Sequence, residues 1–127
     1  MNNPVCHWEL MVNDLGKAKA FYERVFDWKF DTSRPEYTMI ETGAPPGGGM
    51  MLRPPAAPIA ALNTYFAVVD IDATLRQVVE AGGTVAVPRT EIPAVGWFAM
   101  FLDPDNIPVG IFQESAPPAT ARPDGKR

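Results

Sequence analysis

The sequence contains an internal repeat, and this repeat restricts the possible folds more than any other feature. Val12-Asn13-Asp14-Leu15 introduces one amphipathic segment, and Val68-Val69-Asp70-Ile71 introduces a second one at an offset of 56 residues. The same offset aligns Phe26-Asp27-Trp28 with Gly82-Gly83-Thr84, where each helical pattern ends and a strand pattern begins. A repeat of this length indicates two copies of one supersecondary unit, and such a unit seldom buries its apolar face alone.

Length and composition narrow the class of protein. The chain has 127 residues, of which 46% are apolar, and this suits one domain with a real core. The net charge of -4, without a cluster of Lys or Arg, argues against a nucleic-acid partner. No apolar run approaches the roughly 18 residues of a membrane span. With Cys6 as the only cysteine and no signal-peptide pattern at residues 1–4, we expect a cytoplasmic protein.

Each copy starts with a strand pattern that leads into a helix pattern. Alternate residues of the first strand form an apolar face of Cys6, Trp8, Leu10 and Val12, and a mixed face of Val5, His7, Glu9 and Met11. The strand at 62–69 keeps the same parity. Apolar residues then recur at helical spacing, with Asp14 as the N-cap in the first copy and Asp70 or Asp72 in the second. Gly82-Gly83 ends the second helix.

Three short strands complete each copy, so the predicted order is βαβββ, twice. The strands are expected at about 28–31, 36–42 and 48–52, and at about 84–88, 97–102 and 108–113. The modules then span 5–52 and 62–113, with an N-terminal extension at 1–4, a Pro-rich linker at 53–61 and a disordered tail at 114–127. We predict an α+β fold in which a curved, mixed sheet forms a cup lined by the mixed strand faces.

The pattern resembles the vicinal oxygen chelate superfamily, which contains glyoxalase I, bleomycin-resistance proteins, extradiol dioxygenases and epimerases. The resemblance rests on three stretches: His7 to Asp14, Ala20-Phe21-Tyr22, and Gly96-Trp97-Phe98-Ala99 followed by Asp103-Pro104-Asp105. It covers residues 5–113 and implies a single domain of the glyoxalase/bleomycin-resistance type. Asn106 replaces the glycine that usual members have in the turn, and it tolerates the same positive φ.

The resemblance also implies four places for metal ligands, on the first and last strands of each copy. In this sequence those places read His7, Met50, Asn63 and Gly110. Glycine has no side chain, and a thioether is a poor ligand for hard or borderline divalent ions. One imidazole and one amide oxygen do not make a dedicated site for zinc, manganese or iron. We therefore predict no metal and no other cofactor.

His7 and Glu9 are the candidate catalytic residues, and each has a second interpretation. His7 is the only histidine; it is either a proton donor or anchor, or the hydrogen-bonded remainder of a former metal site. Glu9 is either a general base with a pKa raised by burial, or a structural residue that forms a salt bridge with a basic residue such as Arg53 or lies at the rim in water.

The predicted ligand pocket combines these two side chains with others on the mixed faces. Its members are His7, Glu9, Met11, Met50, Asn63, Tyr65 and Gly110. Methionines adapt to varied apolar ligands, although ordinary core filling is the alternative for each of them. Of Trp97 and Phe98, one faces the core, and the alternation does not decide which.

Two functions fit these observations. The first is a metal-free protein that binds a small, partly apolar or aromatic molecule between the modules. The alternative is a lyase, isomerase or dioxygenase relative that uses His7 and Glu9, with an unusual metal or none. Because relatives often pair symmetrically, we also expect a homodimer.

Overall fold

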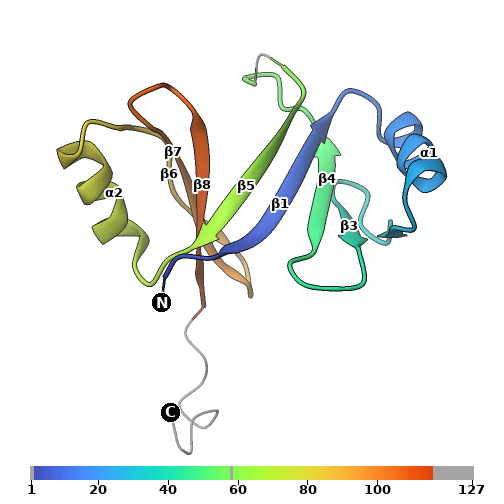
Figure 1. Ribbon diagram of the computed structural model, residues 1–127, viewed down its shortest axis with the longest axis horizontal. Helices are drawn as coiled ribbons and strands as arrows, with labels where there is room; N and C mark the ends of the chain where they lie inside the picture. The colour runs from blue at the N-terminus through green and yellow to red at the C-terminus, as the bar shows by residue number, and fades with distance from the viewer. Residues whose placement is uncertain (1, 58, 116–127) are drawn as a thin grey trace, which may run out of the picture. The chain divides into compact units, whose positions relative to one another are not determined.

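The computed structural model describes residues 2–57 and 59–115, and these form two helices and eight strands. The elements of the first copy are β1 (Val5–Val12), α1 (Leu15–Val25), β2 (Lys29–Asp31), β3 (Thr38–Glu41) and β4 (Gly48–Leu52). Those of the second are β5 (Ala61–Ala67), α2 (Ile71–Glu80), β6 (Thr84–Ile92), β7 (Gly96–Leu102) and β8 (Pro108–Glu114). The predicted order, βαβββ twice, is confirmed (Figure 1).

Contacts within the chain separate two compact units. The first unit spans Asn2–Phe66 and the second begins at Ala67. In the first unit the strand order is β2-β3-β4-β1-β5, with β1 parallel to β4 and antiparallel to β5. In the second unit the order is β8-β7-β6, and both pairs are antiparallel. Strand β5 therefore opens the second sequence copy but pairs with the first strand of the first copy.

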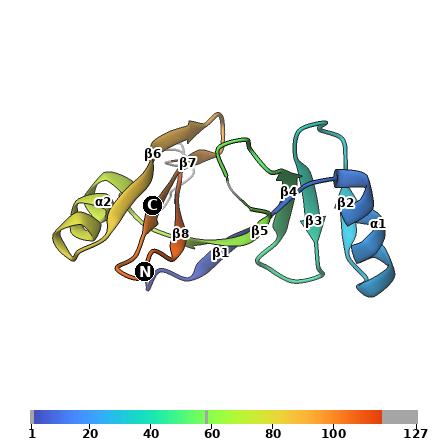
Figure 2. The ribbon, with the colours of Figure 1, turned by 90° about the horizontal axis from the view of Figure 1, so that it is seen from above.

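The core of the first unit lies between its strands and α1. Leu10, Ile40 and Met50 are buried there, from three neighbouring strands. Side chains from α1 and from the segment around β2 pack against them: Leu15, Ala18, Tyr22, Trp28 and Phe30. Figure 2 shows α1 alongside β2 and β3. Each fully buried aliphatic side chain contributes roughly 1.5–3 kcal/mol, so this apolar face holds the unit together.

The core of the second unit has the same construction around α2. Val68, Ile71, Ala99 and Ile111 are buried, and Leu75, Trp97 and Phe101 pack against them. Trp97 is thus the member of the Trp97–Phe98 pair that faces this core, and Phe98 points to the other face of β7.

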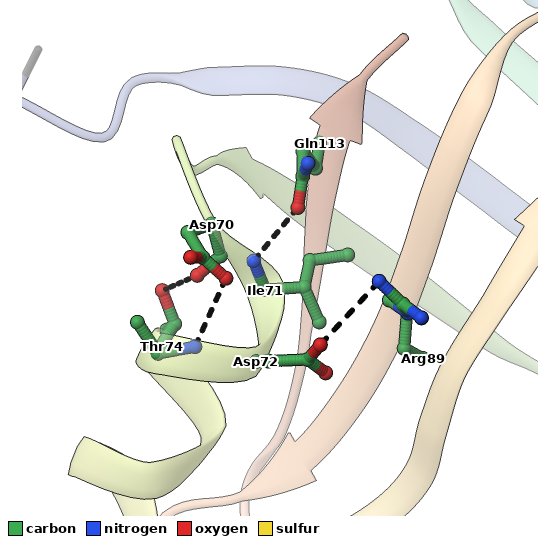
Figure 3. Close-up of polar contacts among 7 residues, drawn as sticks. Asp70, Ile71, Asp72, Thr74, Arg89 and Gln113 are labelled. Carbon is green, nitrogen blue, oxygen red and sulfur yellow. Dashed lines mark hydrogen bonds and ion pairs between the residues drawn. The ribbon is translucent and has the colours of Figure 1, made fainter.

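Polar contacts fix the start of α2, as Figure 3 shows. Asp70 is the N-cap, and its carboxylate accepts from the backbone N–H of Ala73 at 3.1 Å. The backbone N–H of Ile71 donates to Oε1 of Gln113 on β8 at 2.9 Å. Asp72 in the first turn lies 3.4 Å from the Arg89 guanidinium on β6. The helix is therefore attached to two strands at its first turn.

The predicted helix and turn signals are borne out in detail. Asp14 caps α1 by accepting from the backbone N–H of Lys17 at 2.9 Å. Gly82, with φ of +102°, follows α2, and Asn106 adopts a φ of +66°. At the C-terminal end β8 continues to Glu114, which the sequence assigned to the tail. The rest of the predicted tail, 116–127, lies outside the described residues.

No helix in the described part of the chain is long and apolar enough to cross a membrane.

Candidate functional site

A polar cluster lies on the face of the first unit that points away from α1. Antiparallel pairing of β1 with β5 places His7 opposite Tyr65 and Glu9 opposite Asn63. Directly paired residues project from the same side of a sheet, so these four side chains share one face. Trp8 and Leu10 point to the other side, into the core against α1. The predicted parity is therefore confirmed for His7, Glu9, Asn63 and Tyr65, whereas a register shift between Val5 and His7 pairs Val5 with Phe66, which the sequence placed on the other face.

Tyr37, just before β3, joins the two candidate catalytic side chains. Its hydroxyl donates to Oε2 of Glu9 at 2.9 Å and lies 2.8 Å from Nε2 of His7. A second tyrosine hydroxyl, that of Tyr65, donates to the other carboxylate oxygen of Glu9 at 3.2 Å. The Glu9 carboxylate is thus held between two phenols, and His7 reaches it through one of them.

The proton positions in this chain follow from the chemistry of the groups. An ionised carboxylate only accepts hydrogen bonds, so the single hydroxyl hydrogen of Tyr37 points at Glu9. His7 must then donate its Nε2–H to the Tyr37 oxygen. In neutral His7 the other ring nitrogen, Nδ1, is left as an acceptor. The arrangement is a directed chain, from imidazole N–H to phenol O–H to carboxylate.

Burial and the Glu9 charge set the protonation of the neighbouring groups. Burial lowers the pKa of His7, and the negative charge of Glu9 partly opposes this. The pKa values of Tyr37 and Tyr65 are raised, chiefly by burial and then by the charge of Glu9 and the hydrogen bonds to it. Both tyrosines therefore remain protonated donors at neutral pH.

Strand β4 passes beneath Tyr37 with a glycine at the contact. Gly49 pairs with Glu9 in the parallel register. A Cβ added at Gly49 would collide with the hydroxyl and ring of Tyr37. The tyrosine therefore fills the space that any side chain at position 49 would need.

This register corrects one predicted pocket residue. The sequence placed Met50 in the ligand pocket and in the metal quartet, but Met50 pairs with Leu10 and is fully buried in the core against α1. Gly49 occupies the place on the polar face. The sequence missed the register because β4 is glycine-rich, so its Gly-Gly-Met-Met run has no apolar alternation to fix the faces.

The other predicted pocket residues fall in both units. Met11 shares the polar face, since it follows Glu9 by two residues in β1. Asn63 is 6% exposed, and its side chain forms no hydrogen bond with a described residue. Gly110 lies on β8 of the second unit, on the face opposite to the buried Ile111. That Gly110 lines the same cavity as His7 stays a prediction.

Two features of the cluster differ from the sequence-based alternatives. The proposed salt bridge from Arg53 to Glu9 is not observed, because the Arg53 guanidinium donates to Asn13 and to the backbone carbonyl of Ala57. Tyr37 was not predicted as a site residue at all. The sequence offered only a weak signal for it, the run of small residues at 47–49, because the side on which Gly49 lies is known only from the register of the structure.

The donors present do not fit the divalent metal that the family resemblance implies. The described residues contain no group of three or more His, Cys, Asp or Glu side chains that is placed to hold a metal ion. His7 Nε2 and Glu9 Oε2 are both engaged by the Tyr37 hydroxyl, and a protonated phenol is a weak ligand.

Comparisons with known proteins agree with this fold. The model of the Glyoxalase/Bleomycin resistance protein/Dioxygenase superfamily matches residues 5–111. A curated relative from Mycobacterium bovis, named "Putative glyoxylase CFP32", is 32% identical over 113 residues. That match covers 83% of this chain but 43% of the relative, so the chain spans less than half of the relative's length.

Solved structures show the same fold at low sequence identity. Methylmalonyl-CoA epimerase from Mycobacterium tuberculosis has a TM-score of 0.69 at 14% identity, over 93% of this chain and 91% of that one. A variant of homoprotocatechuate 2,3-dioxygenase from B. fuscum has a TM-score of 0.67 at 21% identity, over 90% of this chain and 33% of that one. With the family model matching most of its length, the chain belongs to the glyoxalase/bleomycin resistance protein/dioxygenase superfamily.

Proposed function

We propose that this chain is a metal-free member of the superfamily that binds a small, partly apolar or aromatic molecule on the polar face of the first unit. One observation carries the proposal: the Tyr37 hydroxyl lies within hydrogen-bond distance of both His7 Nε2 and Glu9 Oε2. His7 is the one family ligand position at which this chain has a usual metal-binding side chain, and the Tyr37 hydroxyl occupies its Nε2. The phenol engages both His7 Nε2 and Glu9 Oε2 at once and adds an aromatic ring to the surface beside the Glu9 carboxylate.

The surroundings of the cluster suit an apolar ligand. Met11 extends the face along β1, and Met51, paired with it on β4, lies on the same side. Methionine side chains adapt their shape to irregular apolar molecules. The rings of His7 and Tyr65, with centroids 5.8 Å apart, add aromatic surface. A few fixed polar groups among apolar side chains are typical of small-molecule sites.

Metal analysis combined with a binding screen tests this proposal. Protein purified without chelator is expected to contain well under one equivalent of zinc, manganese, nickel or iron. Aromatic fragments that bind only the folded state are expected to raise the melting temperature. About one equivalent of tightly held metal, together with an activity that EDTA removes, would show that the metal-free interpretation is wrong.

The same hydrogen-bonded chain favours a second candidate, a lyase or isomerase that moves a proton. When Nδ1 of His7 takes a proton from a ligand, its Nε2 proton can pass to the Tyr37 oxygen and the Tyr37 proton to Glu9, which ends protonated. Exchange of a ligand C–H for deuterium in D2O, measured by NMR and lost in Glu9→Gln, would support catalysis over simple binding.

The homodimer remains a prediction from the family resemblance. Sedimentation velocity on the full chain tests it, since a species near the 13.9 kDa chain mass across micromolar concentrations would contradict it.

A further inference from the structure

A buried amide without a described partner marks the centre of the polar face. Asn63 is one of two polar side chains that the described residues bury almost completely, the other being Thr38. The Asn63 amide carries two N–H donors and one carbonyl acceptor, and none of them bonds a described residue. Proteins rarely leave a buried polar group unpaired, and the exceptions commonly mark a functional site.

The position of Asn63 indicates where its partner would lie. Asn63 is directly opposite Glu9 in the β1–β5 pair, so the two side chains leave the sheet about 5 Å apart and on the same side. Each Glu9 oxygen already accepts one tyrosine hydroxyl and keeps a further lone pair. A ligand above this pair therefore meets an acceptor-only group beside a group that both donates and accepts.

The charge on this face disfavours ligands that carry a negative group. On β4, β1 and β5, the residues on this side include one carboxylate, Glu9, and no lysine or arginine. Burial favours the neutral form of His7. A carboxylate or phosphate on the ligand would lie beside Glu9 with no lysine or arginine on these three strands to compensate it, since Lys29 is on the outer strand β2 and pairs with Glu41.

We propose that Asn63 and Glu9 form an anchor for a primary carboxamide on an apolar or aromatic ligand. This inference rests on the proposed function, because it assigns the ligand class of the same site. A carboxamide can pair its carbonyl and one N–H with the amide of Asn63 and direct its second N–H to Glu9. It pairs the Asn63 carbonyl, one Asn63 N–H and Glu9, whereas an amine would leave both Asn63 N–H donors unpaired and an acid would oppose Glu9.

Three fragments of matched size test the anchor: benzamide, benzoate and toluene. Binding to the full chain is followed by NMR titration of uniformly 15N-labelled protein, including the side-chain NH2 signals of Asn63. Benzamide is expected to bind about tenfold or more tightly than either other fragment and to shift those NH2 signals, as one or two hydrogen bonds predict. The substitution Asn63→Leu is expected to remove this preference while toluene still binds.

The matched control is Thr38→Val, because Thr38 is equally buried but pairs with Met50 on the core side. This variant should retain the benzamide preference. Equal binding of toluene and benzamide, or tighter binding of benzoate, would refute the anchor and leave the binding function intact. If none of the three fragments binds, the proposed function fails and the anchor fails with it. If Asn63→Leu does not fold, the wild-type protein alone tests the anchor: a benzamide-induced shift of the Asn63 NH2 signals supports it, and no shift refutes it.

Discussion

Removing the Tyr37 hydroxyl is the most direct test of the polar cluster. The substitution Tyr37→Phe keeps the ring and deletes one oxygen, which contacts His7 at 2.8 Å and Glu9 at 2.9 Å. A hydrogen bond to a charged group contributes about 1.5–3 kcal/mol, and one between neutral groups about 0.5–1.5 kcal/mol. Because the cluster is only partly buried, water can replace part of these two hydrogen bonds. We therefore expect a loss of about 2 kcal/mol from the free energy of unfolding.

Urea denaturation of both proteins at pH 7 measures this loss. At this chain length about 2 kcal/mol corresponds to a fall in Tm of roughly 8 °C, which a thermal melt checks independently. The urea m-value should not change, because the surface exposed on unfolding stays the same. The control is Tyr22→Phe on α1, whose hydroxyl forms no hydrogen bond with a described residue; it should change stability by less than about 0.5 kcal/mol. If Tyr37→Phe is as mild as this control, the hydroxyl does not hold Glu9 and His7 together.

Three further perturbations test the same reasoning. The free energy of unfolding should fall above about pH 10, because the raised pKa values of Tyr37 and Tyr65 mean that the unfolded state loses these protons first. The free energy of unfolding should also fall below about pH 6.5, because the pKa of His7 is lowered in the folded state and the unfolded state takes up this proton first. Urea denaturation at pH values from 5 to 11 measures both decreases. Gly49→Ala should displace the Tyr37 ring and cost about 2 kcal/mol in urea melts, and its effect should be less than additive with Tyr37→Phe. Asp70→Ala should cost about 1 kcal/mol through the lost N-cap of α2, visible as a lower midpoint in urea.

The fold was predictable because its signals are local and repeated. Asp14 and Asp70 stand before apolar residues at helical spacing, and each is the observed N-cap. Alternation in β1 separated Trp8 and Leu10 from His7 and Glu9, and the structure keeps that separation. Such features depend on residues within one turn or one strand of each other, so the sequence contains all that is needed to find them.

The candidate site was less predictable because it depends on contacts between distant residues. Tyr37 lies 28 positions from Glu9 in sequence and just outside β3, where no periodic pattern includes it. The pairing of β1 with β5 brings Tyr65 to Glu9 over 56 positions. The repeat did place Tyr65 as the counterpart of Glu9, which explains why this residue was found and Tyr37 was not.

The observed register of β4 changes which residues occupy the family's metal-ligand positions. A shift of one residue in a strand moves every side chain to the opposite face, and here it exchanges Met50 for Gly49. The four family positions then read His7, Gly49, Asn63 and Gly110, with two side chains that could donate to a metal. At Gly49 the space that a side chain would need is filled by Tyr37, whose hydroxyl bonds the histidine. A tyrosine from outside the strands has thus taken the place of a strand residue. Tyr37 therefore keeps His7 and Glu9 hydrogen-bonded at a strand position where the family resemblance implies a metal ligand.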